Sequence, residues 1–133
     1  MSDRKKIVLV DDNKSFIEAL KFILNFRNDI EVVGEAYDGR QFLELLYETK
    51  PDLVLLDINM PVIDGLNAAR MGIKANQQMK IIGLTMSDSP DLHKEMEKTG
   101  FSGAILKSQF SDHFDNVMDA MKKGVKYFPL LFN

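Results

Sequence analysis

Four apolar runs of the sequence each end in polar side chains that can take part in ion or phosphate chemistry. The run IVLV is followed by Asp11 and Asp12, and the run LVLL by Asp57. The run KIIGL is followed by Thr85, and GAIL by Lys107. Each of these residues alone has an ordinary explanation: the aspartates lie in turns or cap a helix, Thr85 ends a β-run, and Lys107 is solvated. Their chemistry becomes informative if the fold brings them together.

A cluster of these residues would suit phosphoryl chemistry. Three carboxylates that lie close together repel one another unless a hard cation is bound between them. Oxygen ligands without histidine or cysteine favour Mg²⁺ over zinc or copper. Magnesium keeps positions open for water and phosphate oxygens, and a nearby ammonium and hydroxyl suit a phosphoryl group better than a carbonyl substrate. One carboxylate can then be the nucleophile and form an aspartyl phosphate.

Hydrophobic periodicity indicates the elements that would position these residues. Short apolar runs predict five strands, at residues 7–10, 30–36, 53–56, 80–84 and 103–106. Stretches with helical spacing lie between the strands and after the last one. The strands are continuously apolar, which is typical of a parallel sheet covered on both faces. We therefore expect a doubly wound α/β fold, in which ligands bind beyond the carboxyl ends of the strands.

Local signals mark where the helices start and stop. Small or polar capping pairs predict the starts of the second, fourth and fifth helices, at Asp38-Gly39, Ser89-Pro90 and Ser111-Asp112. Gly100 and Gly124 predict the ends of the fourth and fifth helices. His93 and His113 fall on these helices, and we expect both to be surface residues rather than metal ligands or phosphate carriers.

Length and composition indicate a single globular domain. The chain has 133 residues, of which 45% are hydrophobic, which is enough for a sizeable core. The net charge of −3 and the lack of a basic run argue against direct nucleic acid binding. The absence of cysteine excludes disulfides and thiolate metal sites. Neither a signal peptide nor a membrane-spanning run is recognisable, so we expect a cytoplasmic protein without membrane contact.

In this order, the strand-end residues resemble the receiver domain of two-component response regulators. The resemblance is carried by DD after the first strand, DINMP and a later DG after the third, T after the fourth and LK ending the fifth. It covers about residues 5–124 and implies a flavodoxin-like fold whose five-stranded parallel sheet has the order 2-1-3-4-5. Residues 1–133 would form a single receiver domain, with residues 125–133 as an apolar tail or linker stub.

The resemblance also implies a role for each site residue in phosphoryl transfer. Asp57 would be the phosphoacceptor, with a histidine kinase or a histidine phosphotransfer protein as donor. Thr85 and Lys107 would each contact a phosphoryl oxygen. The protein would then be a signalling phosphoacceptor that switches a partner-binding face, and self-phosphorylation and autodephosphorylation would be its only catalytic activities. A homodimer is a further expectation.

A magnesium site follows from the same resemblance. Asp12 and Asp57 would ligate Mg²⁺ directly, and Asp11 would act largely through water. Asn59 would contribute its backbone carbonyl. These four residues and Mg²⁺ make up the expected metal site, and no organic cofactor is expected.

Three further stretches, VVGEAYDGRQFLELL, TGFSGAILKS and MKKGVKYF, resemble the LuxR/NarL-type receiver subfamily. Such receivers usually carry a C-terminal helix-turn-helix DNA-binding domain, which this sequence lacks, so DNA binding is not carried over. Ala104 stands where receivers usually have a tyrosine or phenylalanine that swings inward when Thr85 moves. Met86 is bulky where a small residue is usual. We expect Phe101 to substitute for the missing aromatic ring.

Two other functions would use some of the same features. A haloacid-dehalogenase-type phosphatase also has a strand-terminal aspartate, Mg²⁺, a threonine and a lysine. Its acid–base aspartate would stand at Asn59, which cannot transfer a proton in that role, and the chain is too short for a cap domain. A phosphorylation-independent interaction module would keep only the fold, and Ala104 is the feature that favours this alternative.

Overall fold

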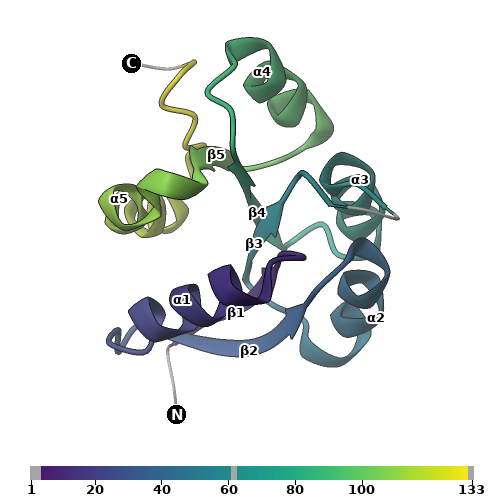
Figure 1. Ribbon diagram of the computed structural model, residues 1–133, viewed down its shortest axis with the longest axis vertical. Helices are drawn as coiled ribbons and strands as arrows, with labels where there is room; N and C mark the ends of the chain where they lie inside the picture. The colour runs from purple at the N-terminus through teal and green to yellow at the C-terminus, as the bar shows by residue number, and fades with distance from the viewer. Residues whose placement is uncertain (1–3, 61–62, 132–133) are drawn as a thin grey trace.

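A computed structural model of the protein describes residues 4–60 and 63–131 and shows one central sheet with helices on both faces (Figure 1). The strands are β1 (Lys5–Val10), β2 (Ile30–Ala36), β3 (Leu53–Asp57), β4 (Lys80–Thr85) and β5 (Gly103–Leu106). The helices are α1 (Lys14–Leu24), α2 (Gly39–Thr49), α3 (Gly65–Ala75), α4 (Pro90–Thr99) and α5 (Phe110–Lys123), and a 3₁₀ turn, Lys107–Gln109, precedes α5. Pro61 of the DINMP motif and the last two residues of the apolar tail lie outside the described residues.

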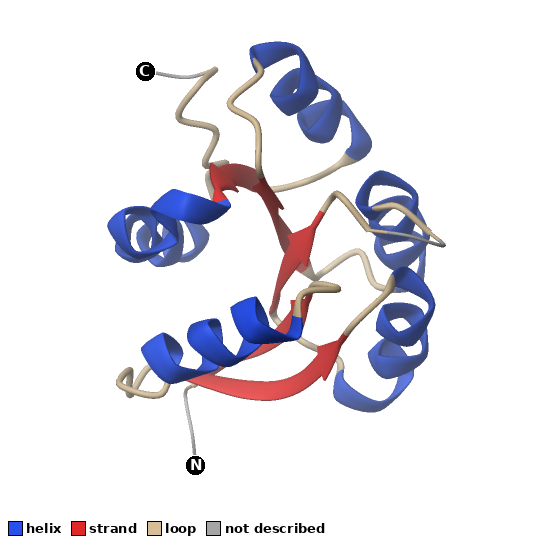
Figure 2. Ribbon diagram, in the orientation of Figure 1, coloured by secondary structure: helices blue, strands red, loops and turns tan. Residues whose placement is uncertain are grey.

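The sheet has the predicted strand order. All neighbouring strands are parallel, and the order is β2-β1-β3-β4-β5 (Figure 2). The order reverses between β1 and β3, so the chain connections diverge there and leave room beyond the strand ends. The predicted doubly wound, flavodoxin-like α/β fold is therefore confirmed, and the β1–β3 boundary is where a ligand site is expected.

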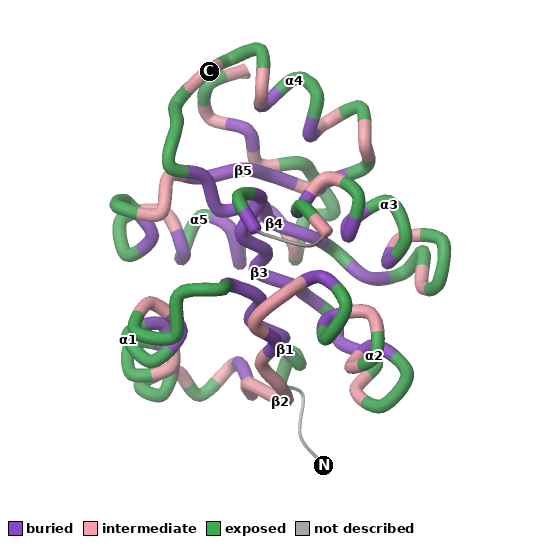
Figure 3. The backbone as a smooth tube through the Cα atoms, turned by 45° about the vertical axis from the view of Figure 1, so that its right-hand side comes forward, coloured by how far each residue is buried: buried purple, intermediate pink, exposed green. Residues whose placement is uncertain are grey.

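Alternating residues of each strand face two separate halves of the core. Ile7 and Leu9 of β1 belong to a cluster that packs under α1 and α5. Val8 and Val10 belong to the opposite cluster, which packs under α2, α3 and α4. Strand β3, most of β4 and β5 and the inward faces of the helices are buried, whereas the edge strand β2 is mostly half-buried (Figure 3). Burial on both faces explains why β3 and the buried parts of β1 and β4 are continuously apolar up to their polar ends.

Most helix ends lie where the capping signals predict them. The side chains of Asp38 and Ser89 accept hydrogen bonds from backbone N–H groups in the first turns of α2 and α4. Gly100 and Gly124 end α4 and α5 with positive φ angles of 114° and 70°. Within the described chain, no helix is long and apolar enough to cross a membrane.

The predicted start of the fifth helix is wrong. We expected Ser111-Asp112 to open it, but α5 begins at Phe110, and the residue before it makes no capping hydrogen bond through its side chain. The 3₁₀ turn runs directly into the helix, and the buried Phe110 ring stacks on Phe114 at a centroid distance of 4.9 Å. Core packing of this ring therefore overrides the local capping signal.

Gly65 should be indispensable at the start of α3. A Cβ at this position would lie 2.3 Å from the Ile58 Cα and 2.6 Å from the Asp57 carbonyl oxygen. Because both are backbone atoms, Gly65→Ala should destabilise the protein by about 1–3 kcal/mol in urea unfolding. Gly72→Ala is the control within the same helix, because its Cβ would meet only the Phe42 and Leu46 side chains, the nearest atom at 3.1 Å. Equal losses in the two variants would contradict this account.

Candidate functional site

The parallel sheet brings the predicted strand-end residues together at the carboxyl-terminal end of its strands. Asp57 ends β3 and Thr85 ends β4, while Asp11 and Lys107 directly follow β1 and β5. One carboxylate oxygen from each of Asp11, Asp12 and Asp57 lies within 4.8 Å of the others. The three carboxylates and the lysine that the sequence suggested as a site therefore do lie together in the folded protein.

Two of the carboxylates are buried. The exposed fractions of Asp11 and Asp57 are 1% and 2%, whereas Asp12 is exposed. The Lys107 ammonium lies 2.7 Å from Asp11 Oδ2 and 3.9 Å from Asp57 Oδ2, and it also sits over the Phe16 ring at 4.5 Å from the ring centre. One ammonium thus faces two buried carboxylates, and the third carboxylate closes the cluster on the solvent side.

The loops after β1 and β3 hold the two buried carboxylates in fixed orientations. Asp11 Oδ1 accepts a hydrogen bond of 2.9 Å from the Asn13 backbone N–H, and Asp57 Oδ1 accepts one of 3.0 Å from the Asn59 backbone N–H. The Asn13 side chain in turn caps α1. Each carboxylate therefore presents its other oxygen, Oδ2, toward Lys107.

The electrostatics of this cluster favour a bound cation. Burial raises the pKa of Asp57 to about 7, and the charge of Asp11 also raises it, against the Asn59 N–H and Lys107, which lower it. Three oxygen donors and a surplus of negative charge fit a small divalent ion such as Mg²⁺. A dication between the carboxylates would relieve their repulsion and keep Asp57 ionised at neutral pH.

Thr85 is at the expected strand end, but its hydroxyl is engaged elsewhere. The side chain is fully buried, and Oγ1 donates a hydrogen bond of 2.7 Å to the Ser87 carbonyl in the loop after β4. This loop carbonyl also lies 3.4 Å from His93 Nε2. The hydroxyl is therefore tied to the start of α4, where it can change partner if a better acceptor arrives.

The expectation that His93 is a surface residue is wrong. It is 1% exposed, burial lowers the pKa of its imidazole, and its Nδ1 has no hydrogen-bond partner among the described residues. His93 shares the inward face of α4 with Met96, three residues later. That i, i+3 spacing was the signal in the sequence that His93 faces inward.

His113 is half-buried, and its Nδ1 lies 2.6 Å from the Tyr127 hydroxyl.

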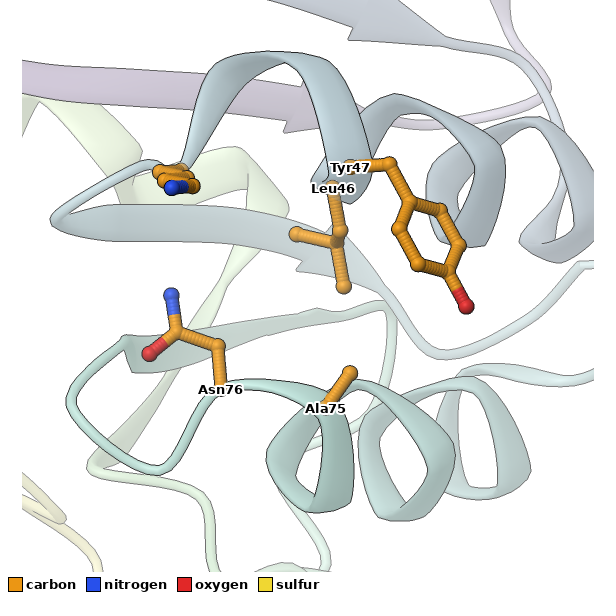
Figure 4. A pocket seen from close by; sticks show the side chains of 5 residues that line it. Leu46, Tyr47, Ala75 and Asn76 are labelled. Carbon is orange, nitrogen blue, oxygen red and sulfur yellow. The ribbon is translucent and has the colours of Figure 1, made fainter.

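A separate cavity of about 340 Å³ lies between the C-terminal ends of α2 and α3 (Figure 4). Its lining residues are Leu46, Tyr47, Lys50, Ala75 and Asn76. The helices run back from the carboxyl to the amino ends of the strands. This cavity therefore lies at the amino-terminal end of the sheet, away from Asp57. None of these lining residues carries a carboxylate, and the cavity has no part in the acidic cluster.

Comparisons with known proteins point to one family. The family described as response regulator receiver domain matches residues 7–121. Transcriptional regulatory protein DegU of Brevibacillus brevis is 34% identical over 122 residues, covering 92% of this chain and 52% of DegU. Transcriptional regulatory protein YdfI of Bacillus subtilis (strain 168) is 33% identical over 119 residues, covering 90% of this chain and 55% of YdfI. The chain spans about half the length of these curated relatives.

Solved structures give the same result. The signal receiver domain of a response regulator NarL from Mycobacterium tuberculosis superposes with a TM-score of 0.81 at 30% identity, covering 90% of this chain and 98% of that one. The non-phosphorylated receiver domain of RcsB from Escherichia coli has a TM-score of 0.85 at 22% identity, covering 95% and 98%, and supports the fold. The chain belongs to the response regulator receiver domain family of two-component signal transduction.

The buried charge of Asp57 should destabilise the metal-free protein. Because the folded-state pKa of about 7 lies above the ordinary value near 4, wild-type stability should fall as the pH rises from about 4 to about 7. Asp57→Asn should remove this dependence and raise the unfolding free energy by about 1–4 kcal/mol at pH 8 in chelator. Denaturant titrations across pH would test this.

Asp12→Asn is the control for this comparison, because it removes a carboxylate of the same cluster that is exposed. It should give a smaller gain in stability and keep most of the pH dependence. A wild-type slope that survives in Asp57→Asn would show that another group is responsible.

Proposed function

We propose that this receiver domain takes a phosphoryl group on Asp57 in a reaction that requires bound Mg²⁺. One observation carries the proposal: the buried Asp57 carboxylate ends β3 inside a cluster of three carboxylates, with the Lys107 ammonium beside it. A buried carboxylate of this kind is a poor structural choice unless it binds a cation or reacts.

In the proposed step, a carboxylate oxygen of Asp57 attacks phosphorus and a new O–P bond forms. The bond from phosphorus to the donor breaks, and its electron pair leaves on the donor, which is a histidine imidazole or the acetate of acetyl phosphate. Mg²⁺ held by Asp11, Asp12, Asp57 and the Asn59 carbonyl would neutralise charge on the phosphoryl oxygens. Lys107 has its ammonium close enough to move from Asp11 to one of those oxygens.

Thr85 would report the event. Its hydroxyl now donates to the Ser87 carbonyl, and a phosphoryl oxygen next to the end of β4 is a charged and therefore stronger acceptor. Exchange of one acceptor for the other would release the loop that leads into α4. The receiver would thus act as a signalling phosphoacceptor whose own catalytic activity is limited to gaining and losing this phosphoryl group.

The proposed partners are a histidine kinase or a histidine phosphotransfer protein. The two curated relatives described above are named transcriptional regulatory proteins, and this chain matches 52% and 55% of their lengths. A phosphorylation-independent interaction module is the second candidate, because Ala104 leaves β5 without the usual switch aromatic.

Incubation with acetyl phosphate and Mg²⁺ should add one phosphoryl group to the wild-type protein, seen in the intact mass and removed by hydroxylamine. Asp57→Asn should remain unmodified. Asp38→Asn is the control, because asparagine can keep the α2 cap while one carboxylate is lost. Modification that persists in Asp57→Asn would move the nucleophile elsewhere, and an unmodified wild type would favour the interaction module.

Asp12→Ala should strongly weaken Mg²⁺ binding. It removes one of three clustered carboxylates and, because Asp12 is exposed, leaves the buried pair and Lys107 in place. We expect the dissociation constant for Mg²⁺ to rise by about tenfold or more, because affinity follows the number of charged ligands. Calorimetric titration would measure this, and an unchanged constant would show that the ion is held without Asp12.

A further inference from the structure

The chain folds back along β5 after α5 ends. Residues 127–131, here called the strap, begin where Tyr127 forms a parallel bridge with Gly103. The Ala104 N–H donates to the Tyr127 carbonyl at 3.0 Å, and the Tyr127 N–H donates to the Ser102 carbonyl at 2.8 Å. In Figure 1 the yellow C-terminal segment accordingly starts next to β5 and runs between α4 and α5. The strap therefore covers the outer edge of β5 as a very short additional strand.

The surface that the strap contacts matches it closely at Gly103 and at Phe128. A Cβ at Gly103 would lie 2.4 Å from the Tyr127 carbonyl oxygen, so the backbone approach requires a glycine there. Phe128 is 1% exposed and belongs to the same core cluster as Phe101 and Ala104. An aromatic ring thus enters the core from the strap, beside the strand that carries only a methyl group at position 104.

A loosely packed wall separates the strap from α4. A cavity of about 120 Å³ lies there, and its lining includes His93 on one side and Pro129 and Leu130 of the strap on the other. His93 is buried, and no described residue hydrogen-bonds its Nδ1, so this wall is not locked by polar contacts on that nitrogen. The cavity and the unpaired nitrogen both cost stability, so this region can gain packing and hydrogen bonds in another arrangement.

The same wall is linked to the phosphoryl site. Thr85 Oγ1 donates to the Ser87 carbonyl at 2.7 Å, and His93 Nε2 lies 3.4 Å from that carbonyl oxygen. A single backbone carbonyl therefore connects the buried threonine at the end of β4 with the histidine that faces the strap. If Thr85 changes its acceptor, the partner of His93 is the first group released.

We propose that the strap is a releasable cover of the β5 edge and that phosphorylation of Asp57 loosens it through Thr85, the Ser87 carbonyl and His93. This inference rests on the proposed function. Gly124 and Val125 still donate hydrogen bonds to carbonyls in the last turn of α5, so the segment that would move begins after Val125. Release exposes unpaired backbone groups of β5 and the socket of Phe128, a surface that fits an extended segment bearing an aromatic residue.

Amide hydrogen exchange of the whole chain tests this, with beryllofluoride and Mg²⁺ as the phosphate mimic. Protection of the Ala104 and Tyr127 amides should fall by about tenfold or more when the mimic binds, whereas the amide of Leu9 in β1 should keep its protection. A shift of the Asn59 amide resonance and the acetyl phosphate mass assay report independently that the site itself is occupied.

Two variants should release the strap without any mimic. Gly103→Ala pushes Tyr127 away from β5, and Phe128→Ala removes the ring while leaving β5 unchanged, so either should make the Tyr127 amide exchange fast. Gly34→Ala is the control in the opposite edge strand, because its Cβ would meet only the flexible Leu45 side chain. It should leave Tyr127 protected.

Each result decides between the two proposals. Mimic binding and phosphorylation with unchanged protection at Ala104 and Tyr127 would overturn strap release and leave the phosphoryl site standing. Failure of both phosphorylation and mimic binding would overturn the two together. Full protection of Tyr127 in both Gly103→Ala and Phe128→Ala would show that the strap is not held by this surface.

Discussion

The accommodation of one buried charge governs the arrangement of the whole carboxyl edge. Strand β3 is buried along its length and ends in Asp57, so the fold delivers an acidic group to a place where an isolated carboxylate is costly. The Lys107 ammonium compensates part of the Asp57 charge, and the Asn59 backbone N–H donates a hydrogen bond to Asp57 Oδ1. Burial and the repulsion from Asp11 therefore favour a bound cation over a stable ion pair at this end of the sheet.

Parallel pairing of the strands places the residues of this cluster next to one another. Because β1 and β3 are direct neighbours and run in the same direction, the loops that follow them start side by side. Each loop hydrogen-bonds the aspartate that precedes it, and the close approach of Gly65 holds the start of α3 against the end of β3. The site is thus built from backbone geometry first, with the side chains placed by it.

Much of this could be predicted from the sequence, for identifiable reasons. The apolar runs of β2 and β5 are bounded by turn residues, and both strands have their predicted bounds. Periodicity cannot say which strands are neighbours, so the strand order came from the family resemblance. His93 was misplaced because its neighbours on α4 are mostly charged, and α5 began earlier than expected because Phe110 gains more from the core than a cap offers. Long-range packing decided both cases.

The apolar tail shows most clearly why local patterns are insufficient. The composition of the tail indicates burial. Its close approach to β5 requires that Gly103 has no Cβ, and its ring packs in the cluster that contains the small Ala104 side chain. In the sequence, Gly103 and Ala104 look like ordinary strand residues. Ala104 has no ring, and the buried Phe128 of the tail belongs to the same core cluster. A chain that supplies a core aromatic from its own C-terminal segment couples that segment to the core. It also makes the edge of β5 dependent on a segment whose attachment is short and can be reversed.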